Sequence, residues 1–192
     1  MWAWIGALAL VQIALWLPGE DFRQLLRYDR TGLEAGEFWR LLTGHFVHGD
    51  LPHLLLNLAG LGLLGLLFPE EYRPRDWFLI GFGAALAIGA GLWWLNPEVH
   101  WYLGLSGLLH GALAAGAFAW WFTQPRLLAI GLTALLLFKL GWEQFHGGSV
   151  LLGGDMAVIV AAHLYGAVGG LVVAMGLRLS GRTPLADGNR HV

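Results

Sequence analysis

The last apolar stretch of the chain, residues 156–177, reads MAVIVAAHLYGAVGGLVVAMGL and contains the histidine His163. A helix of about 20 apolar residues is long enough to cross a bilayer, so this stretch is a predicted membrane span. An ionisable side chain inside a span is costly to bury and is therefore a candidate for a functional site. Its candidate partner is Ser106, which lies in the sequence GLSG, residues 104–107, where another apolar stretch begins. Serine and histidine are the two residue types of a serine hydrolase.

The composition of the whole chain agrees with a membrane location. Of its 192 residues, 57% are hydrophobic and 12% are charged, and the apolar residues form long runs instead of alternating with polar ones. The 29 glycines point the same way, because small residues let transmembrane helices pack closely. A formal net charge of −2 without a long basic run gives no reason to expect a nucleic-acid partner. The absence of cysteine excludes disulfides and thiolate metal sites.

We therefore predict an all-α membrane protein, a bundle of six transmembrane helices that forms a single domain over residues 1–192. The predicted spans are residues 1–17, 51–68, 77–95, 104–122, 126–142 and 156–177. The first span has no basic region before it and no small-residue cleavage site, which favours a retained helix over a signal peptide. Residues 178–192 are predicted to form a cytoplasmic tail.

The basic residues of the loops predict the orientation. Arginines occupy the second-to-third and fourth-to-fifth connections and follow the last span, whereas residues 96–103 and 143–155 contain no Lys or Arg. The positive-inside rule then places both termini in the cytoplasm. The first loop, residues 18–50, opposes this orientation with four arginines, although acidic residues such as Glu20, Asp21, Glu34 and Glu37 accompany them. Its apolar residues, such as Phe38 and Trp39, suggest an amphipathic element on the membrane surface.

Four polar residues from three predicted spans lie at a similar depth. At about 1.5 Å per residue from the cytoplasmic ends, Ser106, His163, His53 and Asn57 all fall in the outer half of the bilayer. His163 is the candidate base for the Ser106 hydroxyl. His53 and Asn57 are four residues apart on one helical face and can donate N–H groups to an oxyanion. The backbone N–H of Ser106, at a helix start, is a further candidate donor.

Two glycine pairs accompany the serine and the histidine. Gly107 and Gly111 follow Ser106, and Gly166 and Gly170 follow His163. They would let the fourth and sixth spans approach closely enough for these side chains to bond. Each motif also has an ordinary packing explanation, because Ser, Gly, His and Asn all occur at contacts between transmembrane helices. The joint pattern at one depth is what favours a catalytic site.

Together these residues resemble the rhomboid family of intramembrane serine proteases. The resemblance rests on Trp39 and Arg40, on HxxHxxxxHxxxN at His45, His48, His53 and Asn57, on GLSG at residues 104–107, and on AHxxGxxxG at Ala162, His163, Gly166 and Gly170. It implies a rhomboid-like bundle with a dyad of Ser106 and His163 and no acidic third member. It also implies an oxyanion hole from His53, Asn57 and the Ser106 amide. We expect neither a cofactor nor a metal.

The segments WRLLTGHFVH and GLSGLLHG resemble more particularly the rhombosortase branch. Many rhomboids carry a tyrosine four residues after the serine, stacked on the catalytic histidine, and this chain has His110 there. We expect His110 to pack beside His163 or tune it, although on the face of Ser106 it is also a rival base. Rhombosortases resemble processing enzymes for exported proteins that end in a Gly-Gly-containing tail with a transmembrane segment and a basic terminus. This resemblance implies cleavage of such a tail in the bacterial inner membrane, at an active site that opens to the periplasmic side.

Three alternatives remain open. One is a general rhomboid protease of other single-span substrates, and another is a non-catalytic rhomboid-like protein that binds membrane clients. A third alternative is a metal enzyme that uses His45, His48 and His53 as ligands. Spacings of three and five residues do not place all three on one helical face, and no HExxH motif is present.

The remaining polar residues near the predicted outer side have simple interpretations. Glu143, His146 and Asp155 are expected to be solvated in an outer loop between the fifth and sixth spans. The glycine pairs of that loop, at 147–148 and 153–154, indicate mobility of the kind that substrate gating needs. Lys139, near the outer end of the fifth span, is expected to extend its ammonium group to the lipid headgroups.

Overall fold

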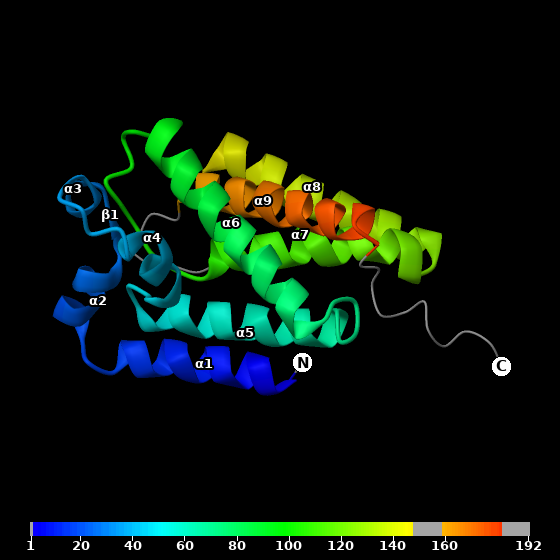
Figure 1. The fold of residues 1–192 in the computed structure, drawn as a ribbon, viewed down its shortest axis with the longest axis horizontal. Helices are drawn as coiled ribbons and strands as arrows, with labels where there is room; N and C mark the ends of the chain where they lie inside the picture. Colours follow the sequence, from blue (N-terminus) through cyan, green and yellow to red (C-terminus); the bar gives the residue numbers. More distant parts are fainter. Residues whose placement is uncertain (1, 148–158, 182–192) are drawn as a thin grey trace.

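The computed structural model describes residues 2–147 and 159–181, and this part of the chain is mainly helical (Figure 1). Each predicted span coincides with a long helix. These helices are α1 (Trp2–Trp16), α5 (Leu51–Leu67), α6 (Pro74–Trp94), α7 (Ser106–Thr123), α8 (Arg126–His146) and α9 (Val160–Leu179). The starts of two helices follow from their sequences. Asp50 caps α5 by accepting the backbone N–H of His53 at 2.7 Å, and α6 begins at Pro74, which has no N–H to leave unpaired.

The number of membrane spans is supported only in part. By length and apolar composition, α6, α8 and α9 can each cross a membrane. Two bent pairs pass the same test together, α1 with α2 (Glu20–Leu26) at 119° and residues Arg40–Phe46 with α5 at 89°. The described part of the chain therefore holds three candidate spans, or up to five. The sixth span remains a prediction, because α7 is not apolar enough along its length to be one of these candidates.

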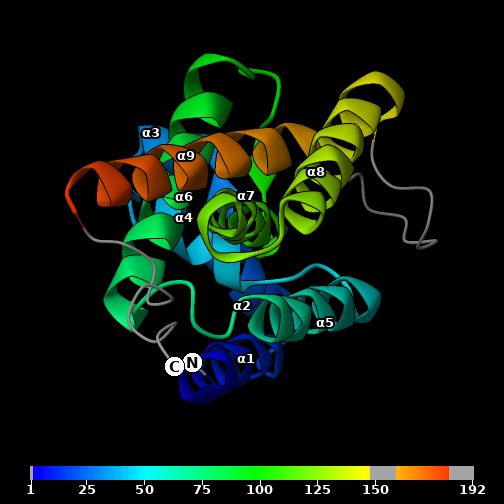
Figure 2. The same cartoon turned by 90° about the vertical axis from the view of Figure 1, so that its right-hand side faces the viewer.

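The position of α7 explains its composition. It lies at the centre of the bundle, where it contacts α5, α6, α8 and α9 (Figure 2). Half of its residues are buried, including Gly107, His110 and Gly111. A helix that other helices surround does not need an apolar surface toward lipid, and it can carry polar groups that face the interior of the bundle.

The contact between α7 and α9 depends on glycine. A Cβ atom at Gly166 would overlap the carbonyl oxygen of Gly107, and one at Gly170 would overlap that of Gly111. The predicted close approach of the two glycine pairs is thus confirmed. Larger residues would separate the two helices, and with them Ser106, the first residue of α7, and His163, the fourth residue of α9.

The buried apolar residues form separate clusters along the bundle. One cluster lies beside the start of α7 and joins α6, α9 and the first loop, and it consists of Tyr28, Leu33, Ile88, Leu92, Tyr102 and Ala162. A second lies farther along α7, between α6 and α9, and consists of Tyr72, Ile80, Ala115, Ala119, Ala174 and Leu177. The polar residues of interest lie beside the first cluster.

The first loop is folded into short elements. They are α2, β1 (Tyr28–Asp29), α3 (Arg30–Glu34), α4 (Arg40–Thr43) and the 3-10 turn η1 (Gly44–Phe46). The strand β1 pairs antiparallel with β2 (Trp101–Tyr102), and Tyr28 lies opposite Tyr102. Leu25, Phe38 and Trp39 are exposed on this loop. Exposed aromatic and aliphatic residues are consistent with the predicted position on the membrane surface.

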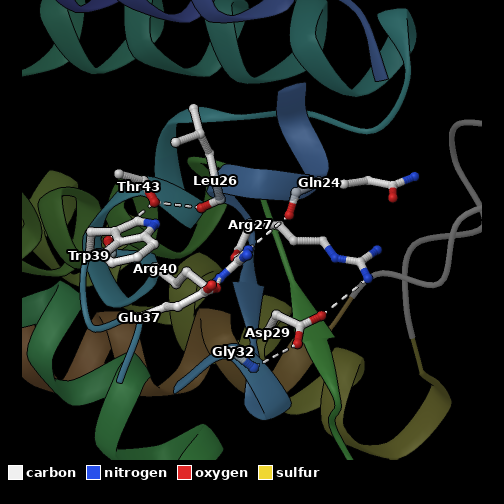
Figure 3. A network of polar contacts seen from close by, with 9 residues as sticks. All are labelled: Gln24, Leu26, Arg27, Asp29, Gly32, Glu37, Trp39, Arg40 and Thr43. Carbon is white, nitrogen blue, oxygen red and sulfur yellow. Dashed lines mark hydrogen bonds and ion pairs between the residues drawn. The ribbon is translucent and has the colours of Figure 1, made fainter. Parts of the chain in front are cut away.

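A buried arginine organises the first loop (Figure 3). The guanidinium of Arg40 donates to the carbonyl oxygens of Gln24 at 2.8 Å and Arg27 at 3.1 Å, and it forms an ion pair with Glu37. Next to it, Asp29 accepts from Gly32 N–H at 3.1 Å and pairs with Arg27 at 3.2 Å. Burial alone would raise the pKa of Asp29, but the hydrogen bond and the arginine charge outweigh it and lower this pKa.

The two ends of the bundle differ in what they contain. The start of α1 and the end of α9 lie toward one end, and the first-loop helices α2, α3 and α4 lie toward the other (Figure 1). This arrangement is compatible with the predicted orientation, in which both termini share a side of the membrane. The orientation itself stays a prediction, and residues 182–192 of the predicted cytoplasmic tail lie outside the described residues.

Candidate active site

Ser106 and His163 are in hydrogen-bond contact. The Oγ atom of Ser106 lies 2.9 Å from Nε2 of His163, and the histidine is 5% exposed. The serine hydroxyl can donate to Nε2 only if that nitrogen carries a lone pair and the ring proton sits on Nδ1. The two side chains that share a predicted depth are therefore brought together by the glycine contact between α7 and α9.

Glu143 lies on the other side of the His163 ring, which corrects the sequence-based interpretation. Its Oε2 atom is 2.9 Å from His163 Nδ1, and the residue is 5% exposed. A carboxylate can only accept, so Nδ1 donates to it, which is the tautomer that the Ser106 contact requires. The prediction of a solvated Glu143 was wrong because α8 continues for a further turn, to His146 instead of ending at residue 142. That extra turn places Glu143 against α9.

Lys139 also differs from its prediction. Its ammonium group forms an ion pair with Glu143 Oε1 one turn along α8, so the group does not simply extend toward lipid headgroups. The Lys139 side chain is 44% exposed, which leaves it partly solvated while it balances the buried carboxylate. The i,i+4 spacing of this Lys–Glu pair was the signal in the sequence that the helix continues past residue 142.

His110 packs flat against His163. The ring centroids are 4.1 Å apart and the planes differ by 14°, which confirms the expected packing contact. His110 Nδ1 lies 2.7 Å from the Ser106 carbonyl oxygen and must donate to it, since a carbonyl only accepts. His110 Nε2 is buried without a hydrogen-bond partner in the described part of the chain. The polar contact of His110 thus goes to the Ser106 backbone, and that of His163 goes to the hydroxyl.

His53 lies against the loop that precedes Ser106. Gly104 has a φ of +115°, a conformation that favours glycine, and a Cβ atom there would lie 2.6 Å from His53 Nε2. Asn57 is 3% exposed, and its Nδ2 donates to the His53 carbonyl at 2.9 Å. The structure therefore brings His53 close to the loop that precedes Ser106. The hydrogen bond of the Asn57 side chain, by contrast, stays within α5.

The loop that precedes Ser106 is held by two contacts that the sequence did not reveal, one within its own segment and one to the first loop. Tyr102 Oη donates to the Gly104 carbonyl at 2.8 Å, and Gly104 N–H donates to the Gly44 carbonyl at 2.9 Å. Two-residue strands carry no periodicity, so the pairing of β1 with β2 and the role of Tyr102 could not be predicted.

His45 and His48 act in packing. Both are buried, His45 with its ring edge-on to Tyr102 at 5.5 Å and His48 edge-on to His53 at 5.0 Å. Each of the two imidazoles therefore packs against a neighbouring ring.

One group of side chains in the described residues has the spacing of a metal site. The ligand atoms of His110, Glu143 and His163 lie within 4.8 Å of one another, a set different from the predicted alternative of His45, His48 and His53. Two members already have partners from the chain, because Lys139 neutralises Glu143 and Ser106 occupies His163 Nε2. Two imidazoles and a carboxylate are nevertheless a donor set that Zn²⁺ accepts.

Comparison with known proteins assigns the chain to a family. Residues 35–180, which are more than half of the chain, match the Rhomboid domain family. The chain is also similar to a Bacillus subtilis (strain 168) protein named "Putative rhomboid protease YdcA", with 25% identity over 108 residues. That alignment covers 53% of this chain and 54% of the relative, so the chain spans about half the length of the curated relative that it matches. The chain belongs to the rhomboid family of intramembrane serine proteases.

Proposed function

We propose that the chain is an intramembrane serine endopeptidase in which Ser106 is the nucleophile and His163 is the general base. The observation that carries the proposal is the 2.9 Å contact between Ser106 Oγ and His163 Nε2. His163 takes the hydroxyl proton as Ser106 attacks a peptide carbonyl, and it returns that proton to the leaving amine. Water, activated by the same histidine, then hydrolyses the acyl-enzyme.

The negative charge that develops on the substrate oxygen needs donors near Ser106. Its backbone N–H is the first of α7, where such groups lack intrahelical partners and the helix dipole favours negative charge. His53 borders the same loop, and Asn57 retains a second amide hydrogen beside the one given to the His53 carbonyl. These three groups are the proposed oxyanion hole.

We place the active site on the periplasmic side of a bacterial inner membrane, with both termini in the cytoplasm. The loop arginines support this orientation. So does the position of Ser106 at the start of α7, near the folded first loop and away from the start of α1 and the end of α9 (Figure 1). The exposed Leu25, Phe38 and Trp39 would contact lipid there.

The proposed substrate is the C-terminal Gly-Gly-type sorting tail of exported proteins, which includes a transmembrane segment. Its support is the resemblance to rhombosortases at residues 39–48 and 104–111 and the histidine at position 110. The His110 ring stacks on His163, so position 110 is in direct contact with the proposed base. Cleavage near the outer end of the tail helix would release the mature protein from its anchor.

The nucleophile is tested by labelling with a fluorophosphonate in detergent and in liposomes. We expect Ser106→Ala and His163→Ala to lose labelling and cleavage of a tail reporter. Ser180→Ala is the matched control, because this serine lies just past the end of α9 and its hydroxyl donates to the Leu177 carbonyl three residues earlier. Labelling that persists in Ser106→Ala would remove the proposed nucleophile.

The substrate class is tested with paired reporters. One carries a Gly-Gly tail, the second the same tail with both glycines replaced by leucine, and the third an unrelated single-span segment. We expect cleavage of the first reporter at least tenfold above the other two, a difference of about 1.4 kcal/mol in transition-state binding. Equal cleavage of all three would favour a general rhomboid protease.

A further inference from the structure

We propose that Glu143 is a positioning residue for His163. We further propose that the Lys139 ammonium group weakens the electrostatic effect of the Glu143 carboxylate on His163. The inference rests on the proposed function, because it assumes that His163 is the base. It extends that function from a dyad to a line of four groups, in the order Lys139, Glu143, His163 and Ser106, contributed by α8, α9 and α7.

The first argument is geometric. The His163 and Glu143 side chains are each 6% exposed and meet at 2.9 Å, so water does not compete for the contact. Because the carboxylate accepts from Nδ1, it holds the ring in the one tautomer whose Nε2 lone pair can take the Ser106 proton. With Glu143 removed, the ring is free to place its proton on Nε2, where it blocks the reaction.

The second argument is electrostatic. When His163 accepts the serine proton it becomes an imidazolium, and an anion fixed beside Nδ1 in a buried site stabilises that charge. The proton stays on His163 and does not pass to the carboxylate. A fixed anion needs no reorganisation as the charge forms, so its effect falls mainly on kcat and little on KM.

Lys139 opposes part of this effect. Its ammonium pairs with the other oxygen of Glu143, which reduces the cost of burying the carboxylate and also weakens the field at His163. The remaining groups that face His163 are His110, stacked on it from α7, and His53, which interacts with it from α5. From α6 the neighbours are apolar, such as Ile88 near Ala162. Glu143 is therefore the anion among the described neighbours that can stabilise the imidazolium.

The experiment compares Glu143→Gln, Lys139→Met and Glu70→Gln. Glu70 is an exposed carboxylate that follows α5, two residues before Tyr72 of the second apolar cluster, and serves as the control for a lost negative charge. Each variant is assayed in liposomes for kcat and KM on the tail reporter, for the rate of fluorophosphonate labelling, and for the pH profile of both.

The two variants should move the pH profile in opposite directions. In Glu143→Gln we expect kcat and the labelling rate to fall about 100-fold with KM little changed. Its acidic limb should shift to lower pH, because the imidazolium loses its stabilising anion. In Lys139→Met the acidic limb should shift to higher pH, because the anion is no longer offset. A purely structural role would lower activity without these opposite shifts.

Several outcomes would overturn the inference. One is a Glu143→Gln enzyme with kcat within twofold of wild type and an unshifted profile. If Glu143→Gln does not fold, an unshifted pH profile in Lys139→Met is enough to overturn the inference. Activity that requires added Zn²⁺ after chelation, and that is lost in Glu143→Gln and His110→Ala, would make the cluster a metal site instead. Failure of the proposed function is seen separately, as labelling that survives Ser106→Ala or His163→Ala.

Discussion

The two ends of α7 bury polar groups in different ways. At its start, Ser106 contacts His163, which contacts Glu143. Farther along, Tyr72 Oη donates to the Ala115 carbonyl at 3.0 Å, and Trp120 Nε1 donates to Glu71 Oε1 at 3.2 Å. Both regions pair most of their buried polar groups, although His110 Nε2 in the first and Trp77 Nε1 in the second have no hydrogen-bond partner in the described part of the chain. Only the first region points a basic lone pair at a hydroxyl, and that direction, more than burial, separates a reactive site from a structural one.

The largest effect is expected from separating α7 and α9 at the end that holds Ser106 and His163. Gly166→Val would place side-chain atoms where the Gly107 carbonyl lies, so α7 and α9 must move apart. A displacement of about 1 Å between Ser106 and His163 is enough to lower the labelling rate by about 100-fold.

Gly131→Val is the control for this prediction, because a Cβ atom at that position of α8 meets no other group within 4 Å. The interpretation of the α7–α9 contact fails if both glycine variants label at the wild-type rate.

The next effect concerns His110, whose ring stacks on the proposed base, His163. His110→Ala removes an aromatic contact and the donor to the Ser106 carbonyl, so we expect a fall in labelling rate of about tenfold. His110→Tyr should recover part of it by restoring a stacked ring. His146→Ala, an exposed histidine on α8, is the control. Activity that survives His163→Ala but not His110→Ala would make His110 the base.

A smaller effect is expected at the other end of α7, on stability alone. Trp120→Phe leaves the buried Glu71 without its indole donor and should lower the free energy of unfolding by about 1–2 kcal/mol. Labelling per folded molecule should not change. A changed labelling rate in a variant that is still folded would show that the two ends are coupled.

Glu71 also gives that end a pH dependence. Burial raises the pKa of its carboxyl group, even though the Trp120 N–H and nearby backbone N–H groups lower it. A carboxyl group whose pKa is higher in the folded state favours folding at low pH. Its contribution is lost as the pH rises through the unfolded value and then the folded one. Glu71→Gln should remove this loss, which thermal unfolding between pH 4 and pH 8 would detect.

The smallest effect is expected in the first loop. The lowered pKa of Asp29 means that its carboxylate adds stability above the unfolded value, and that this stability is lost as the pH falls through the folded value. Asp29→Asn should therefore cost about 0.5–1 kcal/mol at pH 7 and less in acid. An equal cost at both pH values, measured by thermal unfolding, would contradict this.

The sequence predicted the positions of the long helices and the meeting of Ser106 with His163. The lengths of the apolar runs predict the helices. The spacing of the glycines predicts the close approach of two of them, and these glycines are Gly107, Gly111, Gly166 and Gly170. The family match then supports the rhomboid assignment.

Other features depend on contacts that no local pattern records. Glu143 was misplaced because its burial follows from the length of α8 and the side of the helix that meets α9. The composition of α7 reflects its neighbours, which is why it does not meet the criterion for a span. The β1–β2 pairing joins segments too short to show a strand period.

The hydrogen bond from Gly104 N–H to the Gly44 carbonyl joins the loop before Ser106 to η1, the last short element of the first loop. A Cβ atom at Gly44 would lie 2.6 Å from the Tyr28 backbone nitrogen, so these segments are also in direct contact. Mechanical load on the first loop, from bilayer thickness or lateral pressure, therefore has a short and stiff path to Ser106. We therefore expect the labelling rate of Ser106 to depend on the lipid composition of the liposomes.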